Sequence, residues 1–273
     1  MLHCVDGASR LLRRMMLLPA FRCFSISAPA STLYSLTSDH EYFSLLSGRQ
    51  MLAGGSTVYG NVSGGTVLYP GGTINGEVHY GGVIECGTFC GTATGGSVVN
   101  SAQHAASRAA WSSLLQQVNA LTAKSSASFL LGATSFTSGV YSYGTLLVGS
   151  DNLVFDAQGD PNAQFVVRVD NMIQLFGSAG IVLVNGAQAR SVLFTGGFLN
   201  LSASNPLAGV FYARDSVGRA GNINDTITIV SGGGLNFSGT LPNSAVAAPE
   251  PSSVMLILAG GLGMVVLRRR RVR

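Results

Sequence analysis

The 273-residue sequence predicts a mostly β fold: a β-solenoid with one long α-helix packed alongside and a further helix at the C-terminus. Short β-favouring segments alternate with paired glycines in the first part of the chain, and longer β-favouring segments fill the second half. A glycine-free, alanine-rich stretch separates the two. The 36 glycines come in doublets rather than at every third position, which excludes collagen. Only 10% of the residues are charged, which argues against disorder.

The charge balance excludes nucleic acid as a partner. The formal net charge of +4 comes from basic residues near the two ends of the chain. Between residues 31 and 248, seven basic side chains stand against ten acidic ones, so the body of the chain is mildly acidic. Binding to a phosphate backbone needs a clustered basic surface with interleaved aromatics, which the body of this sequence lacks.

Residues 51–100 predict the first coils of the solenoid. They hold 14 glycines, including five adjacent pairs, and between the glycines lie short β-favouring pieces such as Thr57–Tyr59. Segments 60–65 and 76–82 form a partial repeat offset by sixteen residues. Tight corners favour glycine because it reaches positive φ without a Cβ clash, and a flexible linker would lack the interposed Val, Tyr and Ile.

Residues 100–127 predict one amphipathic helix of about 25 residues, roughly 37 Å long at about 1.5 Å per residue. Ser101 is placed to cap its N-terminus, and Lys124 falls in the last turn, where a cation suits the helix dipole. Trp111 is expected to help the helix pack on the sheet. A stripe at three- and four-residue spacing consists of Ala106, Ala110, Leu114, Val118 and Leu121.

Longer strands are expected after Ser128, and turns at 160–161, 185–186 and 232–234 separate some of them. Their spacing fits either solenoid coils or a sandwich, and the helix before them favours a solenoid. The expected strands cover residues 139–143, 146–148, 152–155, 164–169, 180–184, 191–194, 198–201, 209–212 and 226–230.

The two ends of the chain predict targeting segments. Residues 1–30 carry a charged region at Arg10–Arg14, an apolar stretch and small residues at 28–30, as in a secretory signal, although Arg22 interrupts the stretch. Near the other end, the apolar run 254–267 is short of the roughly 20 residues of a full membrane span, and snorkelling arginines can complete it. A basic cluster is predicted to stay on the cytoplasmic side and so to stop the apolar run in the membrane. It consists of Arg268, Arg269, Arg270 and Arg271.

The C-terminal tail resembles the PEP-CTERM sorting signal. Its sorting motif is Pro249, Glu250 and Pro251, followed by the apolar run and the basic end. The resemblance implies an exported protein of a Gram-negative bacterium that is anchored in the inner membrane through the C-terminal helix. An exosortase then processes it and passes it to the cell surface or the exopolysaccharide matrix.

The body of the chain resembles the bacterial ice-binding-like domain family. The segments 156–165 (DAQGDPNAQF), 184–189 (VNGAQA) and 192–194 carry the resemblance, which extends over most of residues 34–241. It implies a right-handed, discontinuous β-solenoid with a long helix beside it. Characterised members bind ice through one flat face of the solenoid, and many other members have no known ligand.

Together these features predict four parts. Residues 1–30 form a signal segment, residues 31–241 the β-solenoid, residues 242–248 a linker, and residues 249–273 the sorting tail with its membrane segment.

An ice-binding face needs a flat array of short hydroxyl and methyl groups. The threonines that alternate along predicted strands occur as scattered pairs rather than as a ladder that repeats from coil to coil. The candidate ice face consists of Thr226, Thr228, Thr134 and Thr137.

Other candidate sites have structural interpretations. Asp156 and Asp160 are interpreted as turn-forming residues, and a calcium-binding loop is the alternative interpretation. Cys86 and Cys90 are a candidate disulfide in an oxidising compartment, with free thiols or a metal site as alternatives. No catalytic residues, metal or cofactor are predicted, so the chain is expected not to be an enzyme. Its expected role is to bind ice or exopolysaccharide; the alternatives are a structural matrix protein or adhesin, and a β-solenoid carbohydrate-active enzyme.

Overall fold

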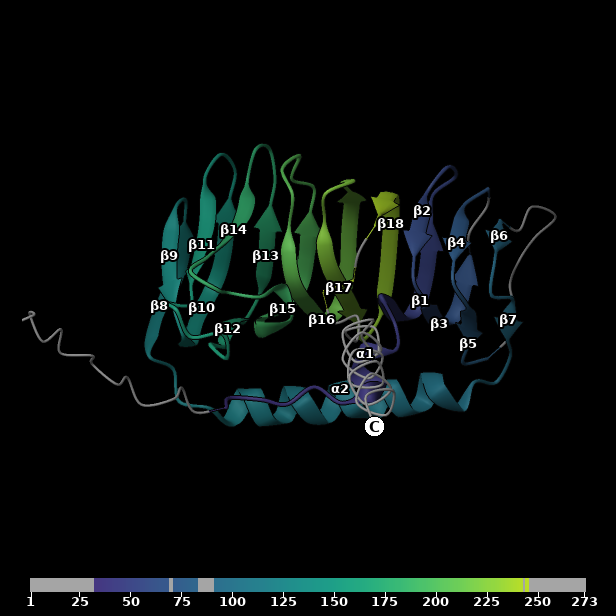
Figure 1. Cartoon of the computed structure of the whole chain (residues 1–273), viewed down its shortest axis with the longest axis horizontal. Helices are drawn as coiled ribbons and strands as arrows, with labels where there is room; N and C mark the ends of the chain where they lie inside the picture. The colour runs from purple at the N-terminus through teal and green to yellow at the C-terminus, as the bar shows by residue number, and fades with distance from the viewer. Residues whose placement is uncertain (1–31, 69–70, 83–90, 243, 246–273) are drawn as a thin grey trace, which may run out of the picture.

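A computed structural model describes residues 32–68, 71–82, 91–242 and 244–245. They form parallel strands stacked into coils, with one long helix beside them (Figure 1). In chain order the elements are α1 (Ser38–Glu41), β1 (Leu45–Leu52), β2 (Thr57–Tyr59), β3 (Val62–Leu68), β4 (Thr73–Asn75), β5 (Val78–Tyr80), β6 (Thr92–Ala93), β7 (Ser97–Val98), α2 (Ala102–Ala120), β8 (Ser125–Leu131), β9 (Thr134–Thr137), β10 (Gly139–Val148), β11 (Asn152–Asp156), β12 (Phe165–Val169), β13 (Met172–Leu175), β14 (Gly180–Val184), η1 (Ala189–Ser191), β15 (Val192–Leu201), β16 (Ala208–Gly221), β17 (Thr226–Ser231) and β18 (Gly234–Leu241).

The coils have up to three faces. The helix face, covered by α2, holds β12, β17, β5, β7 and the first parts of β8, β10, β15, β16, β1 and β3. The open face holds β13, most of β18 and the second parts of those long strands. The third face is interrupted. At one end β11 pairs with β9 and β14, and at the other end the last residues of β18 pair with β2, β2 pairs with β4, and β4 pairs with β6.

The chain fills the solenoid in two separate blocks. Strands β1 to β7 build one end, and α2 then runs along the whole stack to the opposite end, where β8 begins (Figure 1). Strands β8 to β18 fill the space back toward the start, and the seam closes where Leu45 pairs with Ile229 and Arg49 with Gly234. The predicted discontinuous solenoid with a flanking helix is therefore confirmed; its right-handed winding stays a prediction.

The sixteen-residue repeat seen in the sequence is one coil. Val62 on β3 pairs with Val78 on β5, so equivalent residues of the repeat lie side by side. Positive φ explains only some of the glycine corners. Gly55 has φ +79, but at Gly65 the reason is close approach, because a Cβ there would lie 2.5 Å from the carbonyl oxygen of Gly48 in the next coil.

Alternating residues of the strands point into the solenoid and fill it with aliphatic and aromatic side chains. Four phenylalanines, which we name the phenylalanine cluster, contact one another across successive coils, with stacked pairs at both ends and an edge-to-face pair in the middle. The ring centroids of Phe136 and Phe155 are 4.9 Å apart, those of Phe155 and Phe194 are 5.6 Å apart, and those of Phe194 and Phe211 are 4.8 Å apart. Such ring pairs add to the stabilisation that burial alone provides.

Helix α2 packs its apolar residues on the outward side chains of the helix face. Trp111, Leu114 and Val118 are buried in one cluster with side chains of that face such as Val166 and Leu193. The helix has 19 residues rather than about 25, and it ends before the segment that leads into β8. The Ser101 Oγ accepts a 3.1 Å hydrogen bond from the His104 N–H, which confirms the predicted N-cap.

Two details of the predicted helix are wrong. Lys124 lies beyond the last turn, and its N–H donates instead to the Val140 carbonyl at 2.7 Å. The buried stripe begins at His104 and Ser107 rather than at the predicted alanines, because a polar cluster on β3 and β5 lies under the first turns.

Several predicted features lie outside the described residues. They are the signal segment 1–30, the pair Cys86 and Cys90, the sorting motif 249–251, and the apolar run with the arginine cluster that follows it. Among the described residues, no helix has the length and apolar character to span a bilayer.

Candidate functional site

The four predicted ice-face threonines do not share a face. Thr226 and Thr228 lie on β17, which belongs to the helix face, whereas Thr134 and Thr137 lie on β9 of the third face. Thr228 is fully buried, with its hydroxyl 2.7 Å from that of Ser244, so it cannot contact an external surface. The structure therefore corrects this candidate: the alternation along β17 is present, but the segment that follows β18 covers the side on which Thr228 lies.

A different set of threonines forms a regular row on the third face. The alternate positions on these strands, Val58, Ile74 and Leu241, are fully buried, so the threonines beside them point outward. On four successive coils the residues that pair with one another are Thr240, Thr57, Thr73 and Thr92, and we name them the threonine row.

The threonine row repeats one side chain at the spacing of the sheet. Neighbouring strands are about 4.8 Å apart, so identical hydroxyl and methyl groups recur at about that distance. A second outward row, two residues further along the strands, consists of Tyr59, Asn75 and Thr94. None of the four row hydroxyls has a hydrogen-bond partner in the described part of the chain, so all four are free to bind water or ice.

Sequence reasoning missed this row because its members are far apart in the chain. Thr57 and Thr73 are one coil apart and could have been found from the sixteen-residue repeat. Thr240 joins them only because the last coil of the second block closes against the first block.

The open face is broader but less regular. It runs through eight coils without interruption, and Arg49 is the only charged side chain among its described outward-facing residues. Large apolar residues stand out from it: Phe129 is 63% exposed, Leu131 65% and Phe198 55%. Side chains of such different sizes, next to glycines such as Gly218, make an uneven surface.

The aspartates of the 156–165 segment act as turn formers, as predicted. Asp156 Oδ1 accepts a 2.8 Å hydrogen bond from the Gln158 N–H, and Asp160 Oδ1 accepts a 2.9 Å bond from the Asn162 N–H. Within the described ranges, no three His, Cys, Asp or Glu side chains gather where they could hold a metal ion.

A polar cluster lies between the first turns of α2 and the coils of β3 and β5. Glu77 accepts hydrogen bonds from the Tyr42 hydroxyl at 2.7 Å and from His79 Nε2 at 2.8 Å. The bond from His79, and secondarily that from Tyr42, holds the pKa of the Glu77 carboxyl below its usual range. On its other side, His79 Nδ1 lies 2.6 Å from the Oγ of Ser101, the residue that caps α2 through His104.

The cluster makes stability depend on pH through His104. Burial, reinforced by the nearby Arg108, lowers the pKa of His104 to about 4 from 6.5. An unfolded chain therefore binds a proton at pH 5 that the folded chain does not, and folding loses stability as pH falls from 6.5 toward 4. We expect the free energy of unfolding to drop by about 2 kcal/mol between pH 7 and pH 5 from this group.

Urea unfolding of the wild type and of His104→Gln at the two pH values measures this effect. Glutamine can still hydrogen-bond the Ser63 hydroxyl, which lies 2.7 Å from His104 Nδ1. The variant should show a smaller loss on acidification, with the remainder due to His40, whose pKa burial also lowers. An equal loss in both proteins would contradict the assignment to His104.

Comparison with known proteins finds two families that match this sequence. The ice-binding-like family matches residues 45–233, and the PEP-CTERM protein-sorting motif matches residues 247–271. An ice-binding protein of Nostoc sp. (strain HG1) is 28% identical over 154 residues, which cover 52% of this chain and 57% of that protein. The chain thus spans little more than half the length of this relative.

Solved structures share the fold at low identity. An ice-binding protein from an Arctic yeast superposes with a TM-score of 0.62 at 16% identity, over 81% of this chain and 99% of the other. One from the Antarctic ascomycete Antarctomyces psychrotrophicus gives a TM-score of 0.58 at 22% identity, over 74% of this chain and 95% of the other. The family match covers more than half of the sequence, and this chain therefore belongs to the ice-binding-like family and carries a PEP-CTERM sorting motif.

Proposed function

We propose that the protein is an exported, non-enzymatic ice-binding protein whose ice face is the threonine row with the residues beside it. The observation that carries the proposal is the register of Thr240, Thr57, Thr73 and Thr92 on four successive coils. The rigid sheet holds their hydroxyl and methyl groups on one surface at the regular spacing of the strands. A flat crystal surface can therefore contact all four side chains together. Because the groups are already ordered, binding costs little side-chain entropy.

The sorting motif supports a location outside the cytoplasm. A PEP-CTERM motif implies processing by an exosortase. We propose that the apolar run after it holds the protein in the inner membrane of a Gram-negative bacterium before the protein passes to the surface or the exopolysaccharide matrix. An ice-binding face would then be displayed where ice first contacts the cell.

A bulky side chain in the middle of the row tests the face. Thr73 lies between Thr57 and Thr92, so in Thr73→Tyr a large ring would stand out and keep the neighbouring threonines from the crystal. We expect this variant to lose most of its thermal hysteresis and its inhibition of ice recrystallisation, with an unchanged fold by circular dichroism.

The matched control places the same substitution on the open face. Asn200 is exposed on β15, and Asn200→Tyr should leave ice activity near the wild-type level. If Asn200→Tyr abolishes activity and Thr73→Tyr does not, the ice face is the open face. If the wild type has neither thermal hysteresis nor recrystallisation inhibition, ice binding is excluded as the function.

A structural matrix protein or adhesin is the second candidate. The observation that favours it is the exposure of Phe129, Leu131 and Phe198 on the open face. Exposed apolar side chains gathered on one face are typical of surfaces that bind other macromolecules. Retention of the protein in the extracellular matrix together with an absence of ice activity would support this role.

A further inference from the structure

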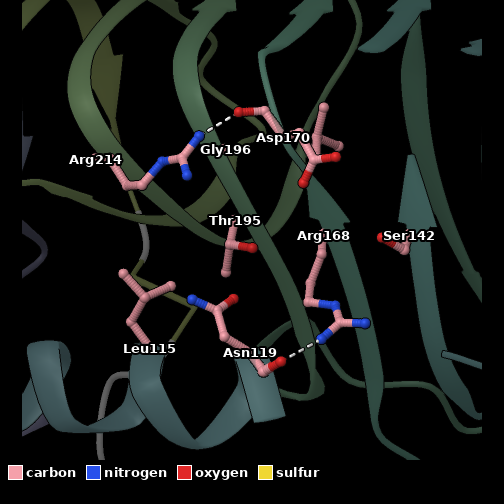
Figure 2. A pocket seen from close by; sticks show the side chains of 9 residues that line it. Leu115, Asn119, Ser142, Arg168, Asp170, Thr195, Gly196 and Arg214 are labelled. Atoms are coloured by element: carbon pink, nitrogen blue, oxygen red, sulfur yellow. Dashed lines mark hydrogen bonds between the residues drawn. The ribbon is translucent and has the colours of Figure 1, made fainter. Parts of the chain in front are cut away.

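A pocket of about 340 Å³ lies between the C-terminal half of α2 and the helix face of β10, β12, β15 and β16 (Figure 2). Leu115 and Asn119 border it from the helix, and Arg168, Thr195 and Arg214 border it from the coils. It is separate from the threonine row, which belongs to the third face at the other end of the stack.

The pocket lies where the apolar packing under the middle of α2 ends. One outward row of the helix face runs through paired residues on successive coils, and its middle members Tyr212 and Val230 are buried under α2. Toward the β10 end the same row changes to Thr195, Arg168 and Ser142. Polar residues where a helix covers a sheet break the local packing rule, and such breaks are expected at functional sites.

These polar groups are only partly used within the protein. Arg168 donates from one terminal nitrogen to the carbonyls of Val118 and Asn119, at 3.2 and 2.8 Å, but its buried Nε has no partner among the described residues. Thr195 is 5% exposed, borders the pocket, and has no hydrogen-bond partner for its hydroxyl in the described part of the chain. Leaving the buried Arg168 Nε without a partner costs stability, which a ligand would recover.

Charge adds a preference for anions. Arg214 donates to the Asp170 carbonyl oxygen and reaches the pocket rim, so two guanidinium groups and one carboxylate, that of Asp170, border a cavity with a net positive charge in a chain whose body is net acidic (Figure 2). Guanidinium groups bind carboxylates through paired hydrogen bonds. Asn119, the hydroxyl of Thr195 and the carboxylate of Asp170 can in turn bind hydroxyl groups of the same ligand.

We propose that this pocket binds a hexuronate, a sugar ring that carries one carboxylate. Pockets for small molecules start at about 300 Å³, so the cavity holds one sugar ring but no large cofactor. The carboxylate lies between Arg168 and Arg214, and the ring hydroxyls face Asn119, Thr195 and Asp170. The same chemistry is offered by a free sugar acid and by one residue of an acidic polysaccharide.

Isothermal titration calorimetry of the full chain tests the site. D-galacturonate should bind saturably with Kd on the order of 1 mM, and neutral D-galactose at least about tenfold more weakly. Arg214→Gln, at the exposed rim, should weaken galacturonate binding about tenfold, and the isosteric Thr195→Val should weaken it several-fold. Arg108→Gln is the matched control, because Arg108 also donates to sheet carbonyls, of Ser231 and Gly232, but does not border the pocket.

Each outcome decides the proposal. Tighter binding of a galacturonate tetramer than of the monomer supports a residue within a polysaccharide as the ligand, and equal binding supports a free sugar acid. The proposal is overturned if galacturonate does not bind saturably, if galactose or inorganic sulfate binds equally well, or if neither Arg214→Gln nor Thr195→Val weakens binding while circular dichroism shows both variants folded. Ice assays on the same variants should show no change.

Discussion

Asp225→Ala is expected to destabilise the protein by about 3–5 kcal/mol, because it leaves the charge of Arg219 buried and unpaired. Both side chains are completely buried, and the Arg219 guanidinium donates to the Asp225 carboxylate. The same carboxylate accepts the N–H groups of Leu207 and Asn222, each at 2.9 Å. It therefore holds together a coil that has no strand on the third face.

Urea unfolding followed by circular dichroism measures the loss. Asp215→Ala is the matched control, since Asp215 is an exposed aspartate on β16, the strand that also carries Arg219, and its replacement should cost at most about 0.5 kcal/mol. The double variant Arg219→Met with Asp225→Ala should be more stable than Asp225→Ala alone, because it leaves no buried charge. A cost for Asp225→Ala no larger than that of the control would show that the pair does not hold the coil.

Phe194→Ala is expected to cost about 3–5 kcal/mol, because it removes a fully buried ring and leaves a cavity. Phe194 packs between the rings of Phe155 and Phe211 inside the solenoid, and neighbouring coils cannot collapse into the space without breaking their strand pairing. The loss should appear in the midpoint of chemical denaturation without a change in far-ultraviolet circular dichroism of the folded protein.

Phe198→Ala provides the comparison on the same strand. Phe198 lies on β15 four residues after Phe194, but it points outward and is 55% exposed. Its replacement should change stability by less than about 1 kcal/mol. Equal effects of the two substitutions would mean that the phenylalanine cluster does not form the core of the second block.

Much of the fold could be predicted from local patterns. The sixteen-residue offset between segments 60–65 and 76–82 corresponds to one coil, and the alanine-rich stretch is the flanking helix. The expected strands at 152–155, 180–184 and 226–230 form as β11, β14 and β17. Strand β18 is not among the expected strands, because its first glycine belongs to the predicted turn at 232–234 and the residues after it show no clear β pattern; its pairing with β1 and β16 makes it a strand.

The candidate site was harder to predict than the fold. Alternation along 226–230 correctly places Thr226 and Thr228 on one side of a strand, but it cannot tell which face of the solenoid that side belongs to. Burial of Thr228 beneath Ser244 is a contact between segments that local pattern does not reveal. In the sequence Arg168 and Thr195 are likewise ordinary strand residues. Only the tertiary structure shows that α2 covers them and that they border a pocket.

By itself the sequence determined the short strands, the glycine corners, the helix and the sorting motif, because each depends on residues close together in the chain. Only the tertiary structure decided which side chains share a face. In a solenoid a face is made of residues one coil apart, and here the coils are stacked in an order different from that of the chain. The threonine row exists because the pairing of β18 with β2 brings Thr240 beside Thr57, and that pairing depends on the whole stack rather than on either segment.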